Sequence, residues 1–292
     1  MGGIASGMSI LQLVLIALMQ GITEWLPISS SAHVMLVSDV VGLAGRDELL
    51  INAASNAGTL LAMLLYFRKD VAAAIAGGFE LLGAPVTRKP LSAGGRLALC
   101  ILVATPFALA GAVIYENFIP ENIWTALRSV YAVAASTIVF GALLWWADAR
   151  GGQSRSEGDM TLRDAFLIGA SQLVAVIIPG TSRSGITMTA ARALGYERVE
   201  AARFSMLIGA PILAAVSLYG LLGLATTPAD GMGASLTDGL IVAALAFVSG
   251  YASIGLLMAL LRKMSFLPFV LYRFALGIAL LATSPIVAGA MG

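Results

Sequence analysis

The sequence predicts an all-α polytopic membrane protein with six transmembrane helices, two re-entrant helical hairpins and an inverted-topology repeat. The evidence is its composition, a set of long apolar runs, and two similar runs that are each interrupted by a proline. Of the 292 residues, 59% are hydrophobic and 11% are charged, whereas a soluble domain carries about 25% charged residues. This composition excludes a soluble enzyme, a nucleic-acid-binding protein and a disordered chain. We expect one integral-membrane domain over residues 1–292.

Six apolar runs without an internal charge are long enough to cross a bilayer, which takes about 20 mostly apolar residues. The runs are Leu49–Phe67, Leu97–Tyr115, Ser129–Ala147, Phe204–Thr227, Gly239–Leu261 and Phe274–Gly292. The single cysteine, Cys100, lies in the second run and excludes an intramolecular disulfide and a CxxC metal site.

The positive-inside rule predicts the orientation of these spans. Segment 68–96 is rich in Lys and Arg and is expected in the cytoplasm, whereas segment 228–238 is acidic, lacks basic residues and is expected outside. If the six spans connect these two segments with the sides given above, all but three of the 17 Lys and Arg residues lie inside. The exceptions are Arg46 and Arg128, which are expected outside, and Arg183, which is expected within the membrane.

Two further apolar runs, 9–38 and 165–194, are interrupted by Pro27 and Pro179. The charge distribution puts both ends of run 165–194 inside and both ends of run 9–38 outside. We therefore interpret the two runs as re-entrant hairpins that enter the membrane from opposite faces. Two ordinary kinked spans are the alternative, and they fit the charge distribution less well.

The two interrupted runs also resemble each other. Each has a glutamine seven residues before its proline, Gln20 in the first run and Gln172 in the second, followed by a hydroxyl-rich turn and an apolar stretch. Two similar halves of opposite direction predict inverted repeats over roughly 9–147 and 160–290. Non-helical backbone at membrane depth must be surrounded by protein or by a wet cavity. We therefore expect the two turns to meet around one polar pocket.

The first turn gathers candidate catalytic residues. Gln20 and Glu24 are four residues apart and share one helix face, and Pro27 is expected to end that helix. Ionisable groups at membrane depth are costly and mark functional sites, which singles out Glu24 and the only histidine, His33. For the nearby serines, helix capping is the alternative role. The other polar residues of this stretch are Thr23, Ser29, Ser30 and Ser31.

The second turn, Pro179–Gly185, has the features of an anion site. Its glycines permit close backbone approach, and the next helix, expected to begin near Ser184, offers free N–H groups. Arg183 adds a guanidinium that matches phosphate oxygens; an arginine that reaches to an interface is the alternative. The candidate phosphate-binding residues are Ser29, Thr181, Ser182, Ser184 and Gly185.

This constellation suits transfer of a phosphoryl group from a lipid phosphate to water. A serine or the histidine would attack, Glu24 would handle protons or a metal, and Arg183 would stabilise charge on the transferred oxygens. A transporter or flippase of polyprenyl phosphate lipids is the alternative, because inverted repeats with broken helices also build transporters. The sequence contains neither a GxxxxGK[ST] loop nor an HExxH motif, so it indicates neither an NTPase nor a zincin.

At Gln20–His33 and Pro179–Gly185 the sequence resembles the undecaprenyl-diphosphate phosphatase family, also known as bacitracin-resistance proteins. The resemblance covers about residues 11–281. It implies a multi-pass enzyme of the bacterial inner (plasma) membrane, with an active site open to the outer, periplasmic side. Such an enzyme converts undecaprenyl diphosphate to undecaprenyl phosphate, recycles this lipid carrier for peptidoglycan and other cell-wall polymers, and confers bacitracin resistance.

By motif position, the resemblance assigns catalytic roles to Glu24, Ser30, His33 and Arg183 and implies a divalent cation, Mg²⁺ or Ca²⁺, at Glu24. Many family members have a glutamate where this chain has Gln20, so the cation site would have one carboxylate here. The supporting candidates are Gln20, Thr23 and Asn56. The sequence leaves open whether Ser30 or His33 attacks, whether the enzyme is a homodimer, and how long a prenyl chain it accepts. We expect a lipid substrate in the bilayer and no nucleic-acid partner.

Overall fold

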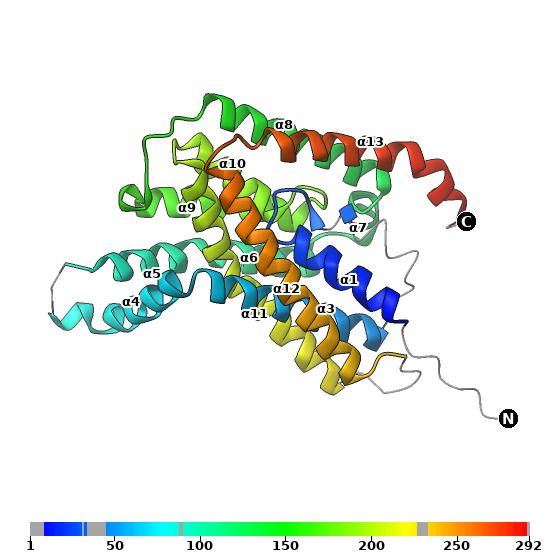
Figure 1. The fold of residues 1–292 in the computed structure, drawn as a ribbon, viewed down its shortest axis with the longest axis horizontal. Coiled ribbons are helices and arrows are strands. Elements are labelled where there is room, and N and C mark those ends of the chain that lie inside the picture. The colour runs from blue at the N-terminus through cyan, green and yellow to red at the C-terminus, as the bar shows by residue number, and fades with distance from the viewer. Residues whose placement is uncertain (1–8, 31, 34–44, 88–89, 227–232, 291–292) are drawn as a thin grey trace.

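The computed structural model describes residues 9–30, 32–33, 45–87, 90–226 and 233–290, and these residues form helices joined by short turns (Figure 1). The helices are α1 Ile10–Thr23, α3 Gly45–Tyr66, α4 Arg68–Thr87, α5 Ala93–Ala104, α6 Pro106–Phe118, α7 Glu121–Leu127, α8 Val130–Arg150, η1 Glu157–Asp159, α9 Leu162–Ile177, α10 Arg183–Ala193, α11 Arg198–Thr226, α12 Leu236–Leu261 and α13 Leu267–Ala290.

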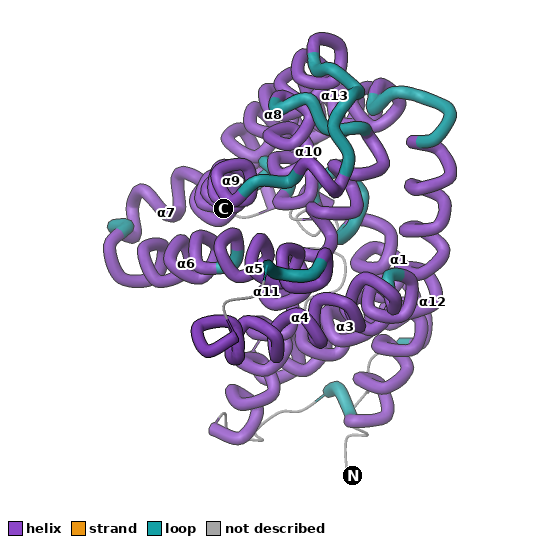
Figure 2. The backbone as a smooth tube through the Cα atoms, turned by 90° about the vertical axis from the view of Figure 1, so that its left-hand side faces the viewer, coloured by secondary structure: helices purple, strands orange, loops and turns teal. Residues whose placement is uncertain are grey.

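The helices pack in two groups. In the first, α3 lies against α11 and α12, and α1 packs on α12; in the second, α8 pairs with α13, and α9 lies against α5, α6 and α10. Helix α10 contacts both groups, through α8 and α11. Figures 1 and 2 show α8 and α13 along one side, α3 on the opposite side, and α9 and α10 between them. Helix α10, in the second interrupted run, thus lies between the two groups.

Within the described residues, five helical segments are long and apolar enough to cross a membrane, so the protein is a multi-pass membrane protein. They are Gly45–Tyr66, Ala93–Tyr115, Val130–Arg150, Arg198–Leu224 and Leu236–Leu261, and they contain most of five of the six predicted runs. The sixth run lies in α13, whose apolar part, Leu267–Ala282, is shorter, and its last two residues lie outside the described part. The count of six spans and the re-entrant path of the two hairpins stay predictions.

A long helix was missing from the sequence prediction. Segment 68–96 was expected to be a basic loop, yet Arg68–Thr87 forms the 20-residue helix α4, which packs along α5. The two helices approach closely at Gly77, where an added Cβ would lie 2.2 Å from the carbonyl oxygen of Gly94. The prediction used only the basic residues at both ends of the segment. The alanine-rich stretch between them favours a helix.

Hydrogen bonds join connecting segments that the charge rule expects on the same side of the membrane. Asp148 is buried and accepts hydrogen bonds from Arg192 and Arg198, both at 2.8 Å, which joins segments expected in the cytoplasm. At the opposite end, Asp47 accepts hydrogen bonds from the backbone N–H groups of Gly233 and Ala234, which joins two segments expected outside.

Candidate active site

The two proline-containing turns have the same local design. Helix α1 ends at Thr23 and α9 ends at Ile177. In each turn the next helix follows a serine with positive φ, +73° at Ser29 and +69° at Ser182. This conformation is uncommon for residues other than glycine and is often found at functional sites. The first helix ends before Pro27, as expected, at Thr23 with Glu24 as its C-cap.

The second turn caps the helix that follows it. The hydroxyl of Ser182 accepts a hydrogen bond from the backbone N–H of Gly185 at 3.1 Å, so Ser182 is the N-cap of α10. Ser182 and Ser184 also join their hydroxyls at 3.2 Å. The predicted start of a helix near Ser184 is therefore confirmed, and Ser182 performs the capping role that was considered as an alternative for such hydroxyls.

The two turns are in direct contact, as the sequence predicted. The Ser184 hydroxyl donates to the carbonyl of Leu26 at 2.9 Å. The guanidinium of Arg273, from α13, donates through one nitrogen to the carbonyls of Pro27 and Thr181, at 3.4 and 2.9 Å. Residues about 150 positions apart in the chain therefore form one site.

An ion pair joins the two turns at the centre of this site. Arg183 Nη2 lies 2.9 Å from Glu24 Oε1, and the two side chains are only 15% and 13% exposed. The amide of Gln20 donates to Glu24 Oε2 at 3.2 Å and to Asn56 Oδ1 at 2.8 Å. The shared helix face of Gln20 and Glu24 is confirmed, and Asn56 on α3 joins them.

Two buried polar atoms of the second turn have no hydrogen-bond partner within the described residues. They are Arg183 Nη1 and Thr181 Oγ1. The guanidinium lies against the backbone of Gly209, where an added Cβ would come within 2.0 Å of Nη1, and 5.3 Å from the ring centre of Trp25. Buried polar groups without a partner are rare and costly. Both atoms are donors that suit an oxyanion.

His33 is held at both ring nitrogens. Its Nδ1 lies 2.7 Å from the carbonyl oxygen of Ser29, which can only accept, so Nδ1 carries the proton. Its Nε2 therefore accepts from the hydroxyl of Tyr272 on α13 at 2.6 Å. His33 is buried, and this arrangement fixes its ring and its tautomer.

Of the remaining predicted residues, Ser30 and Gly185 lie at the site and Thr23 does not. Ser30 is half-buried in the first helical turn after Ser29. Gly185 lies close to the guanidinium of Arg273, because an added Cβ at Gly185 would be 2.9 Å from Arg273 Nη1. Thr23 donates to the carbonyl of Met19 in its own helix at 2.7 Å, so it supports α1 rather than the site. Ser31 lies outside the described residues.

Arg273 corrects the sequence analysis. The charge rule placed it in the cytoplasmic stretch 262–273, and Arg183 was the only basic residue expected within the membrane. Arg273 is instead fully buried in α13, and it also donates to the carbonyls of Thr137 and Gly180. Three of its four acceptors, the carbonyls of Pro27, Gly180 and Thr181, belong to the non-helical turns, which leave carbonyls without helix partners; the fourth, Thr137, lies in α8. The one signal in the sequence was the position of this arginine at the edge of an apolar run. Arginines that only set the orientation of a span occupy the same position, so the signal does not distinguish the two roles.

The chain is similar over nearly its whole length to known proteins. A family model described as "Bacitracin resistance protein BacA" matches residues 13–279. Proteins named undecaprenyl-diphosphatase from Maricaulis maris, Ruegeria pomeroyi and Saccharophagus degradans are 48%, 45% and 44% identical to it. Each alignment covers 94% of this chain and 98% of the relative. The chain therefore belongs to the bacitracin resistance protein BacA family.

Proposed function

We propose that the protein hydrolyses undecaprenyl diphosphate to undecaprenyl phosphate and inorganic phosphate in the bacterial inner membrane. This activity recycles the lipid carrier for peptidoglycan and other cell-wall polymers and confers resistance to bacitracin. The observation that supports it best is the buried Glu24–Arg183 pair between the two turns, with an unpartnered guanidinium nitrogen beside it in the described structure. A carboxylate can accept the proton of the group that attacks a phosphate, and a guanidinium can stabilise the negative charge of that phosphate.

In the proposed mechanism, the terminal phosphate of the lipid binds at the second turn. Arg183 and the Thr181 hydroxyl donate to its oxygens. The nucleophile, Ser30 or His33, forms a bond to the terminal phosphorus while the anhydride P–O bond breaks and undecaprenyl phosphate leaves. Water then cleaves the phospho-enzyme bond and releases inorganic phosphate. Glu24 accepts the proton of the attacking group or of the water.

Of the two candidate nucleophiles, the contacts favour Ser30. Both ring nitrogens of His33 are engaged, with Ser29 and Tyr272. The hydroxyl of Ser30 makes no hydrogen bond within the part of the chain that the structure describes, and it lies at the start of a helix. A helix N-terminus favours the negative charge that develops on an attacking hydroxyl. In this arrangement His33 is a positioning residue that supports the turn around Ser29.

The donor set at Glu24 fits a divalent cation that shares the substrate. Among the described residues, no three His, Cys, Asp or Glu side chains come together as a metal cluster. The site offers the Glu24 carboxylate and the amide oxygens of Gln20 and Asn56, and Mg²⁺ is often held by one or two carboxylates together with substrate phosphates. These three residues would hold Mg²⁺ or Ca²⁺, and the ion would neutralise charge on the diphosphate.

The test of the function is phosphate release from undecaprenyl diphosphate by the purified protein in detergent. Transport across a membrane is impossible in detergent, so phosphate release supports the phosphatase. Binding of the lipid without release of phosphate would favour the flippase. Treatment with EDTA, followed by addition of Mg²⁺ or Ca²⁺ in the same assay, tests the cation.

The first mutational prediction concerns Ser30 and His33. We expect Ser30→Ala and His33→Ala each to lower kcat by about 10²-fold or more, the lower range for a positioned acid–base group. If Ser30 attacks, His33→Gln should recover part of the activity, because an amide can still bond the Ser29 carbonyl, whereas Ser30→Ala abolishes any phospho-enzyme. Trapping of a phosphorylated Ser30→Ala protein by acid quench would reject Ser30 as the nucleophile.

The second prediction concerns orientation, with the site open to the periplasmic side. In a Cys100→Ala background, Asn122→Cys should react with a membrane-impermeant maleimide in intact spheroplasts, and Ser154→Cys should react only after lysis. Both positions are exposed and belong to segments that the charge rule puts on opposite sides. Labelling of the cysteine at 154 in intact cells would reverse the orientation.

A further inference from the structure

Helix α13 packs directly on the helical residues that follow the first turn. The hydroxyl of Tyr272 lies 2.6 Å from Nε2 of His33. The two rings are also stacked, with 5.6 Å between their centroids and 4° between their planes. Ala32, next to His33, is buried in one apolar cluster with Leu276, which follows Tyr272 by one turn of α13. The contact between Tyr272 and His33 is therefore part of a packed interface between the two segments.

His33 connects Tyr272 to the peptide group that precedes Ser30. Its Nε2 accepts from the Tyr272 hydroxyl, and its Nδ1 donates to the carbonyl oxygen of Ser29 at 2.7 Å. That carbonyl and the backbone nitrogen of Ser30 belong to the same planar peptide unit. An imidazole held at both nitrogens therefore fixes the orientation of the peptide group from which Ser30 begins.

Ser29 is the residue that needs this support. Its φ of +73° is uncommon for a residue other than glycine, and such a conformation persists only where the surrounding structure imposes it. Its hydroxyl accepts a hydrogen bond from the backbone N–H of Ala32 at 3.4 Å, which holds the side chain. The bond from His33 holds the carbonyl. The backbone of Ser29 is thus fastened on both sides, and one of the two attachments depends on the histidine.

We propose that Tyr272 is a positioning residue for the phosphoryl transfer, which acts through His33 on the orientation of Ser30. This inference rests on the proposed function. Because the Tyr272 hydroxyl donates to Nε2, the imidazole proton stays on Nδ1, where the bond to Ser29 requires it. A proton on Nε2 would leave a lone pair of Nδ1 against the Ser29 carbonyl, which can only accept. The tyrosine thus selects the tautomer that holds the turn.

The kinetic test is Tyr272→Phe, which removes the hydroxyl and keeps the ring. We expect kcat for undecaprenyl diphosphate to fall about 10-fold, the equivalent of one hydrogen bond. KM should stay within about 2-fold, because the donors to the substrate phosphate are unchanged. In a His33→Ala background, Tyr272→Phe should change kcat by less than about 2-fold, since residues that act through one contact are not additive.

A spectroscopic test follows the contact itself. His33 is the only histidine of the chain, so the imidazole nitrogen signals of protein made with isotope-labelled histidine, and purified without a polyhistidine tag, belong to this one residue. In the wild type we expect the proton on Nδ1 and a hydrogen-bonded Nε2 without a proton. In Tyr272→Phe the Nε2 signal should move toward that of a nitrogen without a donor, and the tautomer with a proton on Nε2 should appear.

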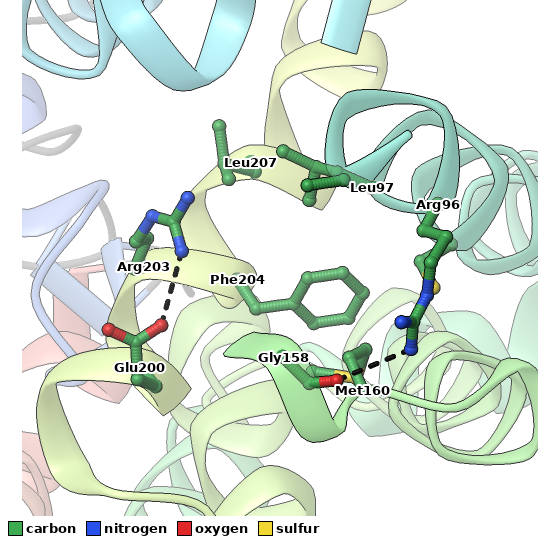
Figure 3. Close-up of a pocket in the computed structure, with 10 residues that line it drawn as sticks. Arg96, Leu97, Gly158, Met160, Glu200, Arg203, Phe204 and Leu207 are labelled. Carbon is green, nitrogen blue, oxygen red and sulfur yellow. Dashed lines mark hydrogen bonds and ion pairs between the residues drawn. The ribbon is translucent and has the colours of Figure 1, made fainter. Parts of the chain in front are cut away.

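Two controls remove a comparable group elsewhere. Tyr251→Phe removes the hydroxyl of a tyrosine on α12 that is 39% exposed, against 45% for Tyr272, and that also stacks on an aromatic ring. Arg96→Gln weakens a contact between a side chain and a backbone carbonyl. Arg96 lines a cavity of about 190 Å³ between α5, η1 and α11 and donates to Gly158 at 3.3 Å (Figure 3). None of the residues that line this cavity belongs to the two turns, so kcat and the histidine spectrum should be unchanged in both controls.

The possible results are distinguishable. If the wild type releases no phosphate, the proposed function is wrong and the inference fails with it, although the spectrum would still show the contact. If the wild type is active and Tyr272→Phe keeps its kcat and its spectrum, the inference alone is overturned. An equal fall of kcat with and without His33 also overturns it, because Tyr272 then does not act through the histidine. If Tyr272→Phe does not fold, the wild-type spectrum decides, since a proton on Nε2 contradicts the contact and a proton on Nδ1 supports it.

Discussion

Replacement of Arg183 by alanine is expected to lower kcat/KM for undecaprenyl diphosphate by about 10³-fold or more, mostly through kcat. A cation inside a membrane protein is costly, by about 2.5–3.5 kcal/mol on insertion scales; Glu24 pairs with Nη2 of Arg183, whereas Nη1 has no partner in the described structure and is left for an anionic ligand. Fixed donors act mainly on charge that develops in the transition state. Arg183→Lys should recover little, because lysine keeps the charge but loses the two-pronged geometry that matches phosphate.

The ion pair with Glu24 dictates the controls for this prediction. The two side chains are 15% and 13% exposed, so removal of Arg183 leaves a largely buried, uncompensated charge, and Arg183→Ala should also lower Tm. The double variant Arg183→Ala/Glu24→Gln removes both charges and should regain Tm without regaining activity. Arg262→Ala, at an exposed arginine, should change neither. Full activity of Arg183→Lys would rule out the bidentate contact, and full activity of Arg183→Ala would place the phosphate elsewhere.

The parts of the site that could be predicted from the sequence are those set by local spacing. Gln20 and Glu24 lie one helical turn apart, so their contact follows from helix geometry alone. The meeting of the two turns was predicted by a physical constraint, since irregular backbone within a membrane needs protein around it. Ser184 and Leu26 realise that contact through one hydrogen bond.

The parts that were missed depend on tertiary packing. Arg273 and Tyr272 come from α13, about 240 residues after the first turn, and no spacing rule connects them with His33 or with Pro27. The charge rule counts every arginine at the end of a span as a residue that sets orientation. It cannot distinguish such a residue from an arginine whose guanidinium points inward and binds backbone carbonyls. Only the packing of α13 on α8 brings the two side chains to the site.

Gln20 is neutral where the family resemblance implied a second carboxylate, and its contacts bear on the role of Glu24. Its amide bonds both Glu24 and Asn56, so it orients the carboxylate without adding charge. Because Glu24 is the one carboxylate among the described residues of the site, proton transfer and cation binding both depend on it. A substitution there should therefore have no neighbouring acid to compensate for it.

We expect Glu24→Ala to lower kcat by about 10²-fold or more, the range for a positioned acid–base group. Glu24→Gln is the sharper test, because its amide oxygen can still accept from Arg183 while the negative charge and the basicity are lost. If Glu24 only positions Arg183, Glu24→Gln should retain most of the activity and Glu24→Ala should not. If Glu24 moves a proton or holds the cation, both variants should be equally impaired.

Measurement of kcat at several concentrations of Mg²⁺ separates the two remaining roles. For a cation ligand, high Mg²⁺ should restore part of the activity of Glu24→Gln; for a general base it should restore none. Glu121→Gln is the control, because Glu121 is an exposed carboxylate on α7 and its loss should leave kcat unchanged. Near-normal turnover in Glu24→Ala would remove Glu24 from the chemistry and leave Arg183 as the one charged residue of the two turns that acts on the phosphate.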